Sequence, residues 1–242
     1  MHAPARIVYP IGPAETSVEI KGETFHYIRH VLRLKQGERI ILLDGRGGIY
    51  EAELVRITAR SALLKILGPC QEPQRESPLK IVLVQSILKS QKMDLVLQKC
   101  TELGVNEFWP VVTERSEVRW TRKLPHWRAV VREATRQCRR AVVPEVREPM
   151  PLEEALRNVS QNALKLIFSE DASSEEWPKE KVSEAYILVG PEGGFSPDEQ
   201  TLAKEYGFVT IRIGPRVLRA ETASVVGSAL VQFLYGDMHC VL

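Results

Sequence analysis

Hydrophobic and polar positions alternate with a short period in the first part of the chain. Runs rich in β-branched and aliphatic residues are separated by glycine-bearing turns, as in a small β-rich domain or barrel. The strands expected there are Ser17–Ile20, Arg39–Leu43, Ile49–Arg56 and Ala62–Leu67. A helical period replaces the strand period over Glu23–Leu34. The first part is therefore predicted to be a β-rich unit with one helix.

The pattern changes after Pro78, where apolar runs alternate with stretches of helical spacing. Leu79–Ile87 is almost continuously apolar, as a strand buried on both faces requires. Further strands are expected at Glu107–Val112, Ala163–Ser169, Tyr186–Val189 and Phe208–Ile213, and helices at Met93–Leu103, Trp127–Cys138, from Ser196 onward, and at Ala223–Leu234. This alternation predicts an α/β domain with a mainly parallel sheet.

Between the two patterns lies Gly68–Pro78, which has three prolines and no periodicity, as expected of a linker. The predicted organisation is a β-rich domain over residues 1–70, a linker over 71–78 and an α/β domain over 79–242.

Composition limits the class of protein. The 242 residues are 44% hydrophobic and 26% charged, which is typical of soluble globular proteins. No apolar run approaches the roughly 18 residues of a membrane span, and Met1–Arg6 lacks a signal-peptide core. The four cysteines form no C-x-x-C pair, so we expect no metal site, no disulfide framework and a cytoplasmic protein.

Positive charge is concentrated in one stretch. Residues 113–140 hold nine Lys or Arg and three Glu, a local balance of +6 in a chain whose net charge is +2. Basic side chains interleaved with Trp120 suit a phosphate backbone and unstacked bases, although a solvated helix surface is the alternative. The candidate RNA-contacting residues are Arg115, Arg119, Arg128, Arg132 and Arg136, together with one expected helix face in the first domain, His26, Arg29, His30 and Arg33.

A glycine-bearing loop, Gly190–Ser196, directly follows an expected strand. It leads into Ser196-Pro197-Asp198-Glu199, a capping box with proline at the first helical position. This layout turns backbone N–H groups toward a ligand at the carboxyl edge of the sheet. The loop is neither a P-loop nor a G-x-G-x-x-G fingerprint, so phosphate binding is unsupported. A tight strand-to-helix turn without a ligand is the alternative.

A second such loop, Gly214–Thr222, follows the expected strand Phe208–Ile213 and precedes an apolar helix. Arg219 and Glu221 lie between two apolar elements, where an idle charge pair would be costly. We expect a functional role for Arg219, whereas for Glu221 a structural ion pair is equally expected.

These residues resemble a known family. Gly190–Phe195 and Gly214–Ala223 are similar to the C-terminal signature of the ribosomal RNA small subunit methyltransferase E family, which belongs to the SPOUT methyltransferases. Matching segments occur in order along the chain at His30–Leu34, Met93–Asp94, Gln98–Val105, Pro110–Ser116 and Glu133–Gln137. One departure is Gln137-Cys138-Arg139-Arg140, where the family often has glycine before the last arginine. It leaves the geometry of that turn open.

The resemblance implies a fold and a reaction that spacing could not show. The expected fold is an α/β knot domain with a C-terminal trefoil knot and an N-terminal PUA-like β-barrel. The expected protein is a homodimer that uses S-adenosyl-L-methionine to methylate N3 of one uridine in the 16S rRNA of the small ribosomal subunit. No metal or membrane is expected to take part.

The resemblance also suggests roles for the two loops. Methyl transfer is an in-line displacement, so alignment and charge handling dominate. Arg219 is expected to stabilise the uridine anion or position the base. Glu221 and Glu192 are weaker candidates for accepting the N3 proton, and direct loss to water is the alternative. The expected cofactor-contacting residues are Leu188, Gly190, Pro191, Glu192, Gly193, Gly194, Ile213, Gly214, Val217, Leu218, Arg219, Thr222 and Ala223.

The sequence is also compatible with three other functions. A non-catalytic RNA-binding protein would retain the fold without turnover, and a related enzyme would methylate a different RNA base. A nucleotide-dependent enzyme would use Gly190–Gly194 as a phosphate loop, although no partner motif for a metal or a ribose accompanies it.

Overall fold

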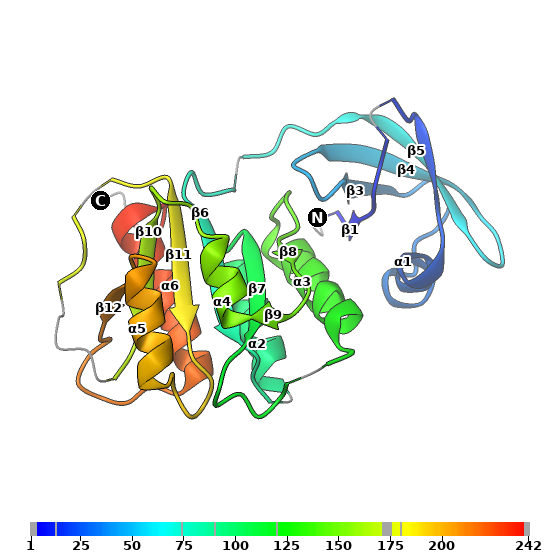
Figure 1. Cartoon of the computed structure of the whole chain (residues 1–242). Coiled ribbons are helices and arrows are strands. Elements are labelled where there is room, and N and C mark those ends of the chain that lie inside the picture. Colours follow the sequence, from blue (N-terminus) through cyan, green and yellow to red (C-terminus); the bar gives the residue numbers. More distant parts are fainter. Residues whose placement is uncertain are drawn as a thin grey trace. The chain divides into compact units, whose positions relative to one another are not determined.

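The computed structural model describes residues 4–12, 14–73, 75–89, 91–119, 121–170, 176–179 and 181–239 (Figure 1). Trp120, which we expected among the basic side chains, lies outside these residues. The chain divides into two compact units, Met1–Glu76 with Thr135–Val143, and Ser77–Ala134 with Pro144–Leu242. Each unit is described by itself. No helix among the described residues is both long and apolar enough to span a membrane.

The first unit is built on a five-stranded sheet in the order β1-β3-β4-β5-β2. Its strands are β1 (Arg6–Val8), β2 (Ser17–Ile20), β3 (Arg39–Leu43), β4 (Ile49–Ile57) and β5 (Ala62–Pro69). The four expected strands are confirmed. β1, which pairs in parallel with β3, was missed because three residues are too few to display a period of two. Alternate positions such as Ile20, Leu54 and Leu64 are fully buried and form the core.

The expected helical stretch over Glu23–Leu34 is confirmed in part, but it is not one continuous α-helix. The segment forms a short α-helix, α1 (Gly22–His26), followed by a π-helix, η1 (Tyr27–Leu32), and it ends at Arg33 with φ of 52°. Leu32, the last residue of the π-helix, and Leu34, beyond the left-handed turn at Arg33, both pack against the core. His26, Arg29 and His30 remain exposed, but Arg33 lies beyond the helix, so the four residues do not share one α-helical face.

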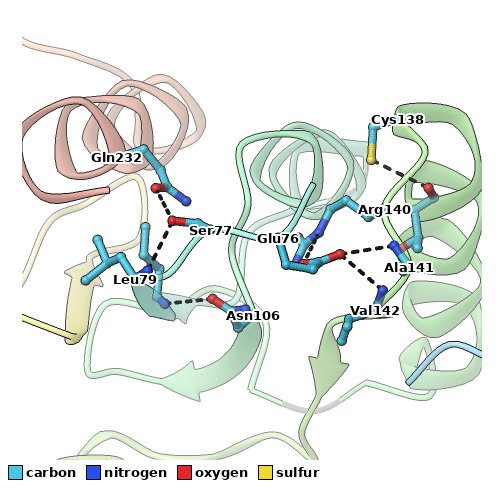
Figure 2. Close-up of polar contacts among 11 residues, drawn as sticks. Glu76, Ser77, Leu79, Asn106, Cys138, Arg140, Ala141, Val142 and Gln232 are labelled. Atoms are coloured by element: carbon cyan, nitrogen blue, oxygen red, sulfur yellow. Dashed lines mark hydrogen bonds and ion pairs between the residues drawn. The ribbon is translucent and has the colours of Figure 1, made fainter. Parts of the chain in front are cut away.

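The expected linker is more structured than its composition suggested. β5 continues to Pro69, and the backbone N–H of Cys70 donates to the carbonyl of Ile49 at 2.8 Å. Glu76 accepts hydrogen bonds from Arg140 Nη2 at 2.7 Å and Nε at 3.0 Å (Figure 2). The same carboxylate accepts the backbone N–H groups of Ala141 and Val142. Glu76 therefore fixes the segment after the C-terminus of α3 (Leu124–Cys138).

Arg139, in the turn where the resemblance leads us to expect glycine, has φ of +67° and is exposed. The left-handed conformation costs a non-glycine residue about 1–2 kcal/mol. Arg139→Gly is therefore expected to raise the free energy of unfolding by about 0.5–1 kcal/mol, after the greater chain entropy of glycine is offset. Urea denaturation would measure this change. The control Gln137→Gly, inside α3, should instead lower stability by about 1 kcal/mol; equal losses in both variants would contradict the account.

The second unit is built on a seven-stranded sheet in the order β12-β10-β11-β6-β7-β8, with β9 also paired to β7. All of its strand pairs are parallel, which confirms the α/β prediction. The strands are β6 (Lys80–Ser86), β7 (Glu107–Val112), β8 (Glu145–Val146), β9 (Met150–Pro151), β10 (Leu164–Phe168), β11 (Glu184–Val189) and β12 (Val209–Ile211). Of these, β8 and β9 were not expected.

Helices cover both faces of this sheet (Figure 1). They are α2 (Gln91–Glu102), α4 (Leu152–Arg157), α5 (Pro197–Glu205) and α6 (Ala220–Tyr235), with most of α3. α4 and α5 bury Leu156 and Ala203 in one cluster with Val84 and Leu188 of the sheet. α2 and α6 pack against each other, and α6 lies against β6 and β11. Loops follow the carboxyl ends of the central strands.

Candidate cofactor and RNA site

The loops that follow β10, β11 and β12 enclose a cavity of about 420 Å³. The carboxyl ends of adjacent parallel strands lie at one edge of the sheet, where ligands of such folds bind. The lining residues are Lys92, Arg115, Phe168, Ser169, Glu170, Val189, Gly190, Pro191, Glu192, Gly193, Gly194, Phe195, Gln200, Arg212, Ile213, Arg216, Val217, Leu218, Arg219, Ala220 and Ala223. Gly190–Ser196 and Gly214–Thr222 are separated by residues 197–213, and both loops line the same cavity. The two glycine-bearing loops thus belong to one site.

The first loop follows β11, which ends at Val189, and it leads into α5. Gly194 has φ of +67°, a conformation that favours glycine, and its N–H donates to the carbonyl of Pro191 at 3.0 Å. Ser196 and Glu199 form the expected capping box, so the N-terminus of α5 is satisfied by its own side chains. The loop is therefore a fixed turn at the edge of the cavity.

A neighbouring loop after β7 holds this turn in place. Arg115 Nη1 donates to the carbonyl of Gly193 at 2.9 Å. Glu199 accepts the backbone N–H of Glu114 at 2.8 Å with one carboxylate oxygen and the N–H of Ser196 at 2.9 Å with the other. Arg115, which we expected to contact RNA, thus has a structural contact with the glycine loop and also lines the cavity.

The second loop connects β12 to α6. Gly214 has φ of +67°, and Arg212 donates from Nε to the carbonyl of Gly214 and from Nη2 to that of Pro215, both at 3.2 Å. Arg219 lies between β12 and α6, as expected, but it is the N-cap residue of α6 and is exposed, so its charge does not bear the cost of burial that the sequence argument assumed. Helix α6 begins one residue later, and this places the Arg219 side chain at the cavity rather than in the core.

Glu221, in contrast, is only 9% exposed. Its Oε2 atom has no hydrogen-bond partner among the described residues and lies 3.9 Å from Lys92 Nζ. Within that part of the chain, Arg219 and Glu221 form no ion pair with each other. Glu221 is therefore a buried carboxylate beside the site, with Lys92 as its nearby cation.

Lys92, at the start of α2, also lies 2.9 Å from Glu192. Burial raises the pKa of the Glu192 carboxyl, but the hydrogen bond and charge of Lys92, together with backbone hydrogen bonds, outweigh burial and hold that pKa below its ordinary value. The hydrogen bond to Glu192 raises the pKa of Lys92. Sequence reasoning missed Lys92, because a lysine on the polar side of an amphipathic helix carries no distinguishing signal.

The structure brings together most, but not all, of the expected cofactor residues. Those that line the cavity are Gly190, Pro191, Glu192, Gly193, Gly194, Ile213, Val217, Leu218, Arg219 and Ala223. Leu188, Gly214 and Thr222 do not line it. Phe168, Ser169 and Glu170 were missed, although the expected strand Ala163–Ser169 ends there, and its carboxyl end was the available signal.

The basic helix α3 has the expected two faces. Trp127 and Val131 are buried, whereas Arg128 and Arg132 are exposed. Arg136 is half-buried, and its guanidinium lies 4.6 Å from the centre of the Tyr27 ring, both residues belonging to the first unit. Arg128, although exposed, donates to the carbonyl of Val146 at 3.1 and 3.3 Å and lies 3.8 Å from Glu148.

Gly227 of α6 makes room for Phe168, which lines the cavity. A Cβ atom at position 227 would lie 2.1 Å from Phe168 Cε2. Gly227→Ala is expected to displace the ring toward the cavity and to weaken ligand binding there about tenfold, with a loss of roughly 1–3 kcal/mol in stability from overpacking. Calorimetric titration with S-adenosylmethionine and thermal unfolding would measure both effects.

The matched variant Gly227→Ala/Phe168→Leu removes the ring that the new methyl group meets. It should recover a large part of the lost stability. If Gly227→Ala binds and unfolds like the parent protein, the close approach of α6 to Phe168 does not shape the cavity.

Comparison with known proteins identifies the family. A model described as an RNA methyltransferase domain matches residues 75–232, and one described as an RNA methyltransferase PUA domain matches residues 20–67. A protein named ribosomal RNA small subunit methyltransferase E, from Buchnera aphidicola subsp. Schizaphis graminum, is 34% identical over 88% of this chain and 89% of its own length. The chain belongs to this family.

Solved structures agree with the family assignment. A ribosomal RNA small subunit methyltransferase E from Neisseria gonorrhoeae, bound to S-adenosyl methionine, is 34% identical with a TM-score of 0.88, covering 98% of this chain and 100% of that one. A methyltransferase from Legionella pneumophila, in complex with the cofactor SAM, is 33% identical with a TM-score of 0.91 and the same coverage.

Proposed function

We propose that this protein transfers a methyl group from S-adenosyl-L-methionine to N3 of a specific uridine in the 16S rRNA of the small ribosomal subunit. The observation that carries the proposal is the convergence of both glycine-bearing loops on one cavity, in a chain of the ribosomal RNA small subunit methyltransferase E family. The methyl donor named with two similar solved structures supports the cofactor.

The residues of the cavity fit this cofactor. A volume of about 420 Å³ lies within the range of small-molecule sites. Phe168, Val189 and Leu218 offer apolar surface for an adenine ring, and the glycine loop offers backbone groups for hydrogen bonding. A Cβ atom at Gly194 would meet nothing within 4 Å, so the space beside that backbone is open. S-adenosylmethionine supplies an electrophilic methyl group.

The protein must then handle the proton and the charge of the uridine base. N3 carries a proton and becomes a good nucleophile once that proton is lost. Arg219, an exposed cation at the cavity, is suited to stabilise the resulting anion or to position the base. Glu192 is a poor proton acceptor because Lys92 lowers its pKa, which leaves Glu221 or direct loss to water.

We also propose the finer architecture that the family resemblance implies. The domains are a PUA-like β-barrel over residues 1–70, a linker over 71–78 and a methyltransferase domain over 79–242 with a C-terminal trefoil knot, except that residues 135–143 belong to the first compact unit. Exposed Phe233, Leu234 and Met238 on and after α6 support a homodimer. We expect the protein to act in the cytoplasm.

RNA contact is proposed for the basic surfaces of both units. The residues are His26, Arg29, His30 and Arg33 in the first unit, and Arg115, Arg119, Arg128 and Arg132 in the second, with Arg136 near the C-terminus of α3. Exposed guanidinium groups on α3 support this assignment, because phosphate contacts need accessible cations.

Labelled methyl transfer to small ribosomal subunits that lack the modification, followed by mapping of the labelled base, tests the proposed function. Label at uridine N3 in 16S rRNA is the expected result. Label on another base would replace the substrate assignment, and binding of the donor without transfer would favour a non-catalytic RNA-binding protein.

A further inference from the structure

The residues that line the cavity carry more positive charge than the proposed cofactor can neutralise. Five of its lining residues are cationic, Lys92, Arg115, Arg212, Arg216 and Arg219, whereas two are carboxylates, Glu170 and Glu192. Lys92 already pairs with Glu192. S-adenosylmethionine offers one carboxylate but also bears a sulfonium and an ammonium cation, so it cannot neutralise four arginines. The lining could therefore accept a further anion besides the cofactor.

The four arginines differ in what they already contact. Arg115 donates to Gly193 and Arg212 donates to Gly214 and Pro215, so both hold backbone carbonyls of the two loops. Arg216 stands on the loop that Arg212 braces, and it is exposed. Across the described ranges, neither Arg216 nor Arg219 makes an ion pair. Arg219 is proposed to act on the base, which leaves Arg216 without an assigned role.

We propose that Arg216 binds a backbone phosphate of the RNA strand whose nucleotide enters the cavity, and that Arg212 positions the loop for this contact. The inference rests on the proposed function, because it takes RNA as the substrate. A guanidinium is a suitable donor to phosphate oxygens, and a contact at the mouth of the cavity would fix the register of the nucleotide without reading its base.

Arg216→Gln tests the inference through the salt dependence of RNA binding. We expect its affinity for small ribosomal subunits lacking the modification to fall about threefold to tenfold at low salt. The slope of log affinity against log salt should become shallower by roughly 0.7–0.9, the loss of one phosphate contact. The affinity for S-adenosylmethionine, measured by calorimetry, should change less than about twofold. Lys204→Gln, an exposed cation on α5, is the matched control and should change none of these.

Two results would overturn the inference. One is an unchanged affinity and salt slope in Arg216→Gln. The other is a loss of affinity for S-adenosylmethionine with unchanged RNA binding, which would assign Arg216 to the cofactor. The methyl-transfer assay on the parent protein separates the two proposals: if that protein transfers no methyl group but Arg216→Gln still reduces the slope, the proposed function fails and the phosphate contact stands.

Discussion

Arg219→Ala is expected to lower the rate of methyl transfer about 100-fold to 1,000-fold while the affinity for S-adenosylmethionine changes little. Removing one donor that stabilises a developing anion typically has an effect of this size. Arg219 is exposed at the cavity and has no ion pair in the described part of the chain, so its loss leaves no buried charge behind. Single-turnover transfer to small ribosomal subunits and calorimetric titration with the cofactor would measure the two quantities.

The conservative variant Arg219→Lys keeps the charge but not the planar group. It should recover part of the rate if charge stabilisation dominates and little of it if the planar guanidinium positions the base. Parent-like turnover in Arg219→Ala would remove Arg219 from the mechanism. A matched loss of cofactor affinity would instead make it a binding residue.

Glu76→Ala is expected to lower the free energy of unfolding by about 3 kcal/mol. The side chains of Glu76 and Arg140 are 12% and 4% exposed, and breaking a buried ion pair is far more costly than breaking an exposed one. The change also removes the acceptor of two backbone N–H groups, those of Ala141 and Val142. Urea denaturation followed by circular dichroism would measure the loss.

Glu153→Ala is the matched control, because its partner Arg157 is exposed and the pair lies within one helix. It should cost less than about 1 kcal/mol. If the two variants are equally stable, the carboxylate of Glu76 contributes no more than a surface charge.

Most regular elements of this protein were predictable, because their apolar positions follow a strand or helix period, but the short helix α4 was not expected. β1, β8 and β9 have two or three residues each, too few for any period to appear. The π-helix over Tyr27–Leu32 was not predictable, because the spacing of the apolar residues there also fits an α-helix. Contacts between distant parts of the chain, rather than the local sequence, determine where these short strands and the π-helix form.

The parts of the candidate site that were predictable lie in the two glycine-bearing loops. Gly194 and Gly214 have the positive φ angles that their loops require. Lys92 and Phe168 reach the cavity only through the tertiary arrangement, so their types and spacing did not reveal them. The expected helix Ala223–Leu234 begins three residues after the observed start of α6 at Ala220, so the exposed N-cap position of Arg219 was not foreseen.

The first unit is formed by two separate segments of the chain, so it cannot be exchanged between proteins as one continuous segment. Val142 forms β-bridges with Gly45 and Arg46, and Val143 packs against the cluster of Val8, Ile41 and Leu43. Residues 135–143 are therefore part of this unit although they are encoded well after it. A gene fragment ending at the expected linker would omit them. Recombination at a single site after the linker would therefore not transfer the complete first unit. We expect the sequences of the N-terminal domain and of residues 135–143 to change together in evolution.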